Sequence, residues 1–222
     1  MKLIDLHTHT FFSDGVLSPA ELVYRCKLME CEAVAITDHV DYSNLEFVLG
    51  SIKKAAAKLR KYYEIEVVTG VELTYIPPVD IESMVNEARQ NGAEIVVVHG
   101  ETSAEEVPKG TNLAAVKAKC DILAHPGHLS EREAEIAKSN NVCIELTTRN
   151  GHRNTNNEVY IAAKKKGCKI VLNTDTHSPA DLIEEYTVKK ILHLCNMGIE
   201  NYAEFRSNSW ELVEKARQTR RR

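Results

Sequence analysis

The segment Glu94-Ile-Val-Val-Val-His-Gly100 holds four consecutive apolar residues followed by a histidine. A strand with one face in water normally alternates apolar and polar residues, whereas a parallel strand covered by helices on both faces is apolar throughout. The run also has the length of a strand. Residues 94–98 are therefore predicted to form a buried strand of a parallel sheet.

Six more segments follow the same pattern. Strands are predicted at Lys2–Leu6, Ala33–Thr37, Ile65–Thr69, Asp121–Ala124, Val142–Leu146 and Lys169–Asn173. Amphipathic helices are predicted between them, at Pro19–Glu30, Leu45–Tyr62, Ile81–Asn91, Leu113–Lys119, Glu131–Asn140 and Asn157–Lys166. Ser18 is a typical N-cap, with Pro19 at the first helical position, and Gly167 is a typical helix stop. Residues 180–217 predict two or three further helices that close the fold.

Seven strands that alternate with helices indicate an α/β fold with a parallel sheet. Periodicity alone leaves open whether the sheet is doubly wound or closed into a barrel. The sequence contains neither a Gly-x-Gly-x-x-Gly nor a Gly-x-x-x-x-Gly-Lys-Ser/Thr loop, which disfavours the nucleotide-binding open sheets. Without a linker or repeat, residues 1–222 are expected to form one domain.

Composition excludes several classes of protein. The net charge of −4 provides no sequence-wide basic field, so strong nucleic-acid binding is not expected. No run approaches the roughly 20 apolar residues of a membrane span, and no signal peptide is evident at the N-terminus. The six cysteines are scattered without a Cys-x-x-Cys pair, which indicates reduced, buried thiols and a cytoplasmic protein.

Ionisable side chains collect where the predicted strands end. They comprise six histidines and three carboxylates, namely His7, His9, Asp14, His39, Glu72, His99, His125, Asp175 and His177. Parallel strands bring their C-terminal ends to one edge of the sheet, where sites of α/β proteins are built. A lone histidine at a strand end, such as His99, is more often a structural residue. The whole set together points to a shared site.

The residue types in this set suit metal ions. His7 and His9 are two residues apart on an extended strand and so point to the same side, and Asp175 and His177 repeat this spacing. Nine unpaired groups would carry a large desolvation cost that cations remove. Imidazole mixed with carboxylate favours zinc, manganese or iron, and nine ligands imply two or three ions. Closely spaced ions are typical of phosphoester hydrolysis.

In chain order, the motifs resemble those of the polymerase-and-histidinol-phosphatase (PHP) family. The matching segments are His7-Thr-His9, Ser13-Asp14-Gly15, Thr37-Asp38-His39, Gly70-Val71-Glu72, His99-Gly100, Ala124-His125-Pro126 and Asp175-Thr176-His177. The resemblance implies a distorted (β/α)7, TIM-like barrel over residues 1 to about 180, with closing helices to about 217. The basic tail at 218–222, part of the charged run from Arg217, is expected to be solvated and frayed.

The resemblance also implies a trinuclear centre at the C-terminal rim of the barrel. By analogy, one ion would be held by His7, His9, Glu72 and Asp175, a second by Glu72, His99 and His125, and a third by Asp14, His39 and His177. Asp14 stands where some members have histidine, a change that favours manganese or iron.

These observations predict a metal-dependent phosphomonoesterase that acts on a small phosphorylated substrate, with histidinol phosphate as the best-known example for this family. Arg149 is predicted to bind the phosphate, with Arg153 as a weaker candidate. His128 is a candidate general acid, and Glu101 a candidate partner of a metal ligand or water. His152 and His193 are given no role. Residues 146–157 are expected to form a polar pocket wall, and residues 100–111 a lid.

Two alternatives stay open at this level. A phosphodiesterase or exonuclease would use the same metals, although a chain with 6% aromatic residues and no basic groove argues against it. A non-catalytic metal-stabilised domain is disfavoured because all nine ligands are present. The sequence does not reveal the oligomeric state.

Overall fold

The computed structural model describes residues 2–221. The strands are β1 (Leu3–Asp5), β2 (Cys31–Ile36), β3 (His39–Val40), β4 (Glu66–Leu73), β5 (Ile95–His99), β6 (Ile122–Ala124), β7 (Cys143–Thr147) and β8 (Ile170–Asn173). The α-helices are α1 (Pro19–Leu28), α2 (Leu45–Tyr63), α3 (Ile81–Gln90), α4 (Thr111–Lys117), α5 (Glu131–Asn140), α6 (Asn156–Lys166), α7 (Glu185–Leu194) and α8 (Ile199–Arg220). Two short 3₁₀ helices, η1 (His152–Thr155) and η2 (Pro179–Asp181), follow β7 and β8.

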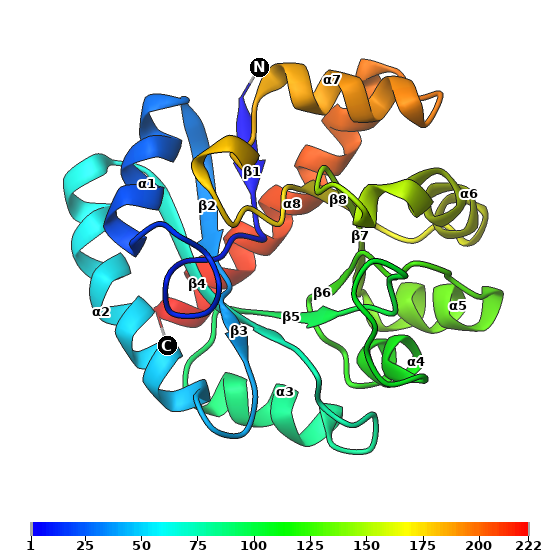
Figure 1. Ribbon diagram of the computed structural model, residues 1–222, viewed down its shortest axis with the longest axis horizontal. Helices are drawn as coiled ribbons and strands as arrows, with labels where there is room; N and C mark the ends of the chain where they lie inside the picture. Colours follow the sequence, from blue (N-terminus) through cyan, green and yellow to red (C-terminus); the bar gives the residue numbers. More distant parts are fainter. Residues whose placement is uncertain (1, 222) are drawn as a thin grey trace.

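The strands form a nearly closed barrel. Seven of them pair in the order β1-β2-β4-β5-β6-β7-β8, and every pair is parallel. The two ends of this path meet just beyond β1 and β8, where Thr8 bridges Thr176 and the His9 amide donates to Thr176 O over 2.8 Å. Helices surround the strands (Figure 1). The predicted α/β barrel is thus confirmed.

Two details of the sheet differ from the sequence-based prediction. A short strand, β3, pairs with β4 and carries His39. β4 extends to Leu73 and not to residue 69, so that Glu72 lies within the strand. The extension runs through Gly70, where a Cβ would lie 2.3 Å from Ile95 Cγ2, so glycine permits the close approach of β4 to β5.

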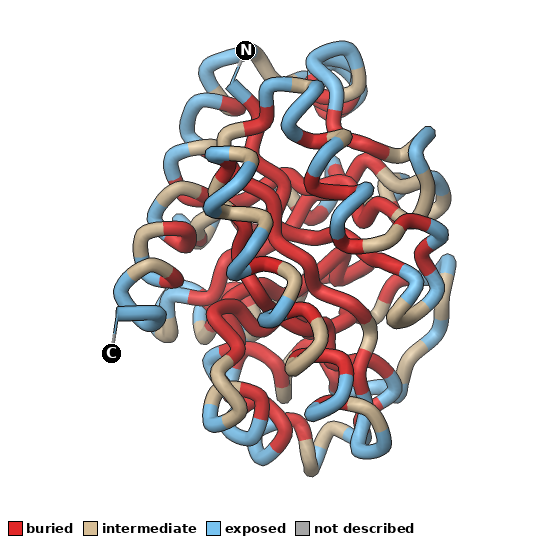
Figure 2. The backbone as a smooth tube through the Cα atoms, turned by 90° about the vertical axis from the view of Figure 1, so that its left-hand side faces the viewer, coloured by how far each residue is buried: buried red, intermediate tan, exposed pale blue. Residues whose placement is uncertain are grey.

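Two apolar clusters hold the barrel together. The larger lies between the strands and the outer helices, and includes residues such as Leu22, Ile52 and Met84. The smaller fills the barrel interior with side chains such as Ile4, Val97 and Val171. Figure 2 shows buried backbone running through the middle of the molecule, with exposed segments at its periphery. The rim residues therefore stand on a rigid, close-packed base.

Helix α8 closes the end of the barrel opposite to the rim. It crosses behind the strands in Figure 1, and its Leu212, Val213 and Ala216 pack into the interior cluster. Its polar side chains pair with residues at the starts of strands: Arg217 donates to Glu66 over 2.9 Å and Lys215 pairs with Asp121.

The expectation of a frayed tail is wrong for most of its residues. Helix α8 continues to Arg220, whose guanidinium donates to Glu94 over 2.6 Å and pairs with Glu66 over 2.8 Å. These carboxylates at the starts of β4 and β5 hold the last helical turn in place. Arg222 lies outside the described residues.

Several smaller expectations are confirmed. The Ser18 side chain accepts from the Glu21 amide over 3.2 Å, and Gly167 ends α6 with φ 71°. All six cysteines are free and buried. Within residues 2–221, no helix is both long and apolar enough to cross a membrane.

Replacing Val213 with aspartate should strongly destabilise the protein. Val213 is fully buried in the interior cluster, so the variant must bury an unpaired carboxylate or protonate it. We expect the free energy of unfolding, measured by urea titration, to fall by at least about 3 kcal/mol. Gln218→Asp, at an exposed position of the same helix, is the control and should change it by less than about 0.5 kcal/mol. Equal losses in both variants would show that α8 does not close the barrel as described.

Candidate metal centre

The structure brings the nine strand-end residues together at the C-terminal rim. His7 and His9 follow β1, Asp14 lies in the loop before α1, and His39 begins β3. The remaining five come from the ends of four other strands: Glu72 in β4, His99 at the end of β5, His125 after β6, and Asp175 and His177 after β8. The parallel arrangement explains this convergence, because all the C-terminal ends point the same way.

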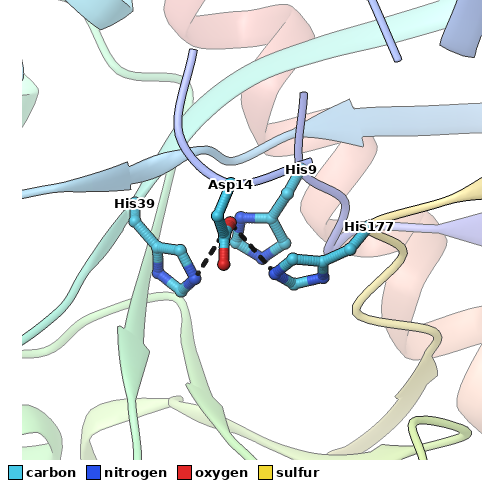
Figure 3. Close-up of side chains that lie close together, drawn as sticks. All are labelled: His9, Asp14, His39 and His177. Carbon is cyan, nitrogen blue, oxygen red and sulfur yellow. Dashed lines mark ion pairs between the residues drawn. The ribbon is translucent and has the colours of Figure 1, made fainter. Parts of the chain in front are cut away.

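The first group consists of His9, Asp14, His39 and His177. Asp14 Oδ1 lies 3.1 Å from His177 Nε2 and 3.6 Å from His39 Nε2. Figure 3 shows the carboxylate of Asp14 between these two rings, with the His9 ring beside them. One ligand atom from each of the four lies within 4.8 Å of the others, so the group can hold an ion. Gly15 permits the loop to fold here, because a Cβ would lie 2.5 Å from His9 O.

The second group contains His7, His9 and Asp175. His9 Nε2 lies 3.1 Å and His7 Nε2 3.8 Å from Asp175 Oδ1. Asp175 has a left-handed backbone with φ 55°, and its amide donates to His7 O over 3.0 Å. This uncommon conformation for a non-glycine residue is held by the contact that closes the barrel.

The third group contains Glu72, His99 and His125. Glu72 Oε1 lies 3.7 Å from His125 Nε2, and the His99 and His125 ring centres are 4.6 Å apart. The other oxygen, Glu72 Oε2, lies 3.2 Å from His7 Nε2 and 2.8 Å from His39 Nδ1. Glu72 therefore contacts residues of all three groups and stands where a bridging carboxylate would.

Many of the facing atoms are buried without a hydrogen-bond partner. They include His7 Nε2, both ring nitrogens of His9, both oxygens of Glu72, His125 Nδ1 and Asp175 Oδ1. Burying a polar group without a partner costs about 1–3 kcal/mol, and more when the group is charged. Lone pairs that converge in this way fit cations, so the residues present fit a cluster of divalent metal ions.

The crowding of charged groups at the rim shifts their pKa values. Burial would raise the pKa of Glu72, but His7 and His39 outweigh burial and hold the pKa well below its usual value. Burial lowers the pKa of His9 and of His125, and neighbouring imidazoles add to that effect. Burial raises the pKa of Asp175 to about 7.

Three residues outside the predicted nine also lie at the centre. Glu145 of β7 places Oε1 3.0 Å from His7 Nδ1. His152 of η1 is 5% exposed and its ring lies 4.4 Å from that of His125, although it was given no role. Glu105 places Oε2 3.6 Å from His99 Nε2. A carboxylate within the apolar strand 142–146 was a usable signal for Glu145. His152 and Glu105 lie in the segments 146–157 and 100–111, which were predicted as a pocket wall and a lid without a role for either side chain.

Arg149 is the only predicted non-ligand residue that the structure places against the nine. Its guanidinium is 27% exposed, lies 3.4 Å from Asp175 Oδ2 and contacts His177 Nδ1 at 2.6 Å. Arg153 donates instead to Thr148 O and to Asn150.

The structure places Glu101, His128 and His193 elsewhere. Glu101 was expected to contact a metal ligand or a water. Its Oε1 instead accepts from the Gly110 and Asn112 amides, each over 3.0 Å, and so closes the 100–111 loop. The His128 ring is exposed, and within residues 2–221 no contact joins it to the nine. His193 lies in α7, as its helical setting suggested.

Known proteins share this chain's sequence and fold. A protein-family model described as the PHP domain matches residues 5–219. An uncharacterized protein of Methanocaldococcus jannaschii is 47% identical over 202 residues, covering 89% of this chain and 93% of that protein. The DNA polymerase/3′-5′ exonuclease PolX of Bacillus subtilis is 26% identical over 193 residues, covering 78% of this chain but 34% of that protein. The match to the polymerase is thus confined to about a third of its length.

A solved structure with the same fold is the histidinol phosphate phosphatase of Lactococcus lactis, complexed with zinc, L-histidinol and phosphate. It superimposes with a TM-score of 0.61 at 18% identity, covering 89% of this chain and 95% of that chain. At this identity the likeness shows a common fold.

Metal binding should release protons at neutral pH. Burial lowers the pKa of His39, but the Glu72 carboxylate outweighs burial and raises the pKa to about 9. The ring is therefore protonated at pH 7 in the metal-free protein, and it must lose that proton to bind an ion. The apparent Zn²⁺ affinity should rise with pH up to about 9, by up to about tenfold per unit for each proton displaced. Calorimetric titration in buffers of different ionisation enthalpy measures the release. An affinity that is constant from pH 6 to 9 would contradict it.

Proposed function

The chain belongs to the PHP domain family, and from this premise we propose that it is a phosphatase that hydrolyses a small phosphate monoester with two or three divalent ions. It is a metal-dependent hydrolase of phosphoester bonds. We propose in addition that the protein prefers a monoester bond, acts on a small substrate and uses two or three ions. Zinc, manganese and iron are the metals that suit a donor set of imidazole and carboxylate.

The proposal is supported by the imidazole and carboxylate groups that converge at the rim, where many of their atoms lack a hydrogen-bond partner, and by the guanidinium beside them. The three groups described above would each hold an ion, with Glu72 shared. Divalent ions supply charge neutralisation at phosphoryl oxygens and make water nucleophilic at neutral pH. Arg149, partly exposed at the same rim, can donate to the phosphoryl group through the guanidinium N–H bonds that Asp175 and His177 do not engage, and so orient it.

An open depression beside the first group favours a substrate without a second anionic group. Its volume is about 310 Å³, at the lower end for ligand sites. Acidic and hydroxyl side chains line it, including Asp14, Asp41, Glu105 and Tyr75, and no lysine or arginine does. Asp41 and Glu105, which are not among the nine residues, leave negative charge on this lining; that charge repels a polyanion such as an oligonucleotide and accepts an uncharged or cationic alcohol. Histidinol phosphate, whose alcohol carries an amine and an imidazole, is the first substrate to test.

Parallel assays of a monoester and a diester test the bond preference. We expect purified protein to hydrolyse histidinol phosphate or another small monoester, and to hydrolyse bis(p-nitrophenyl) phosphate and short oligonucleotides at least about 100-fold more slowly, a difference of about 2.7 kcal/mol in transition-state stabilisation. Chelation should abolish turnover, as should His7→Ala or Glu72→Ala. A diester preference would favour an exonuclease like the Bacillus subtilis relative. Full turnover after metal removal would contradict the mechanism.

Loss of the Arg149 guanidinium should weaken catalysis. We expect Arg149→Ala to lower kcat/KM by roughly 100-fold or more, the typical effect of removing one donor to a developing anion. Arg153→Ala is the matched control, because that guanidinium donates to Thr148 O and Asn150 and does not contact the nine residues. It should lower kcat/KM by less than about fivefold, or roughly 1 kcal/mol. Similar losses in both variants would remove the assignment of Arg149 to the phosphate.

A further inference from the structure

We propose that Glu145 is a positioning residue of the metal centre, which fixes His7 and His125 in the orientation that receives an ion without binding the ion itself. The inference rests on the proposed function only in that the nine residues hold metal. Glu145 lies in β7, is fully buried, and belongs to none of the sets that the family resemblance implies.

The contacts of Glu145 join four strands. Its Oε1 lies 3.0 Å from His7 Nδ1 and accepts from Asn173 Nδ2 over 2.8 Å. Its Oε2 lies 3.2 Å from His7 Nδ1 and accepts from the His125 amide over 3.1 Å. Through these atoms the carboxylate connects β7 to residues at the ends of β1, β6 and β8. Asn173 extends the connection, because its Oδ1 accepts from the Leu6 amide over 2.9 Å.

The pairing of its oxygens separates Glu145 from the ligand carboxylates. Both oxygens of Glu145 accept hydrogen bonds. Both oxygens of Glu72 and Oδ1 of Asp175 are buried without a hydrogen-bond partner and contact the neighbouring imidazoles only as ion pairs. The two ring nitrogens of His7 differ in the same way. Nδ1 faces Glu145, whereas Nε2 faces Glu72 and Asp175 and lacks a hydrogen-bond partner. Glu145, His7 and His125 also lie close enough together to form a possible metal group of their own. Glu145 differs from the other carboxylates in that three N–H donors already occupy its two oxygens.

This arrangement determines which nitrogen of His7 can bind metal. A carboxylate at Nδ1 requires a proton there, which leaves the lone pair on Nε2, the atom that faces the second group. The negative charge also makes the imidazole a better donor. At His125 the same carboxylate holds the backbone amide, and that residue has the strained φ of 25°. One side chain thus positions a ligand in each of two groups.

The decisive variant is Glu145→Gln, which keeps the shape of the side chain and removes its charge. In the wild-type protein, the three donors His7 Nδ1, the His125 amide and Asn173 Nδ2 share the two oxygens of Glu145. Glutamine replaces one of these oxygens by an NH₂ group, which donates, so at least one of the contacts is lost. Zn²⁺ affinity is measured by competition with a chromogenic chelator in the absence of phosphate, together with the number of ions bound. We expect the weakest-bound ion to lose about 10- to 100-fold in affinity, as for other residues that support metal ligands.

Asp121→Asn is the matched control. Asp121 is also a buried carboxylate between neighbouring strands, 3% exposed, and it accepts from the Val96 amide over 2.8 Å, but at the opposite end of the barrel. We expect it to lower the free energy of unfolding of the metal-free protein while its Zn²⁺ affinity stays within about twofold of wild type, or roughly 0.4 kcal/mol. Glu145→Asp, which retains charge but shortens the side chain, provides the same measurement if Glu145→Gln does not fold.

The outcomes separate the two claims. If wild type binds zinc and the Glu145 variants bind it with the same affinity, the positioning role is overturned and the proposed function stays intact. An equal loss in Asp121→Asn also overturns it, because stability alone would then explain the effect. A wild-type protein that binds no divalent ion contradicts the proposed function and, with it, this inference.

Discussion

Glu72 stands at the point where the contacts of the rim converge, with one oxygen toward His7 and His39 and the other toward His125. Neither oxygen of this buried carboxylate accepts a hydrogen bond, and burying such a group is costly. The ion pairs with His7 and His39 offset part of that cost. His7, His9, His125 and Asp175 each also bury at least one polar atom that lacks a hydrogen-bond partner, and this lack is the deficit that these groups share. Cations between these groups resolve the deficit for all of them at once, which is why the rim is best understood as a metal centre and not as a set of separate structural histidines.

The rest of the molecule serves to hold these groups in place. The interior cluster and helix α8 fill the barrel from the opposite end, so that the strand ends form a rigid base. At the seam between β1 and β8 the backbone contacts that close the barrel also position His7, His9 and Asp175. Closure of the barrel at this seam therefore also brings together ligands that follow β1 and β8. Glu145 and Asn173 strengthen that seam from within.

Much of the fold could be predicted from the sequence because parallel strands leave a strong local signal. Apolar runs such as Ile95–Val98 and the cap at Ser18 depend on near neighbours, and both are found where they were expected. The extension of β4 past Gly70 and the attachment of Arg220 were missed, because each depends on a partner distant in sequence, Ile95 or Glu94. Strand-end position likewise identified the nine residues that converge. It could not identify His152 or Glu105, whose placement depends on loop conformation, nor show that Glu101 closes its own loop.

Anomalous X-ray diffraction from crystals grown with Zn²⁺ and phosphate tests the central claim most directly. We predict two or three zinc peaks, each enclosed by one of the groups around Asp14, Asp175 and Glu72. Glu72 should lie between two of the peaks, and Glu145 should be hydrogen-bonded to His7 without contacting any of them. Phosphate density should lie between the ions and Arg149. An absence of anomalous signal among the nine residues, in protein that still hydrolyses phosphoesters, would contradict the account.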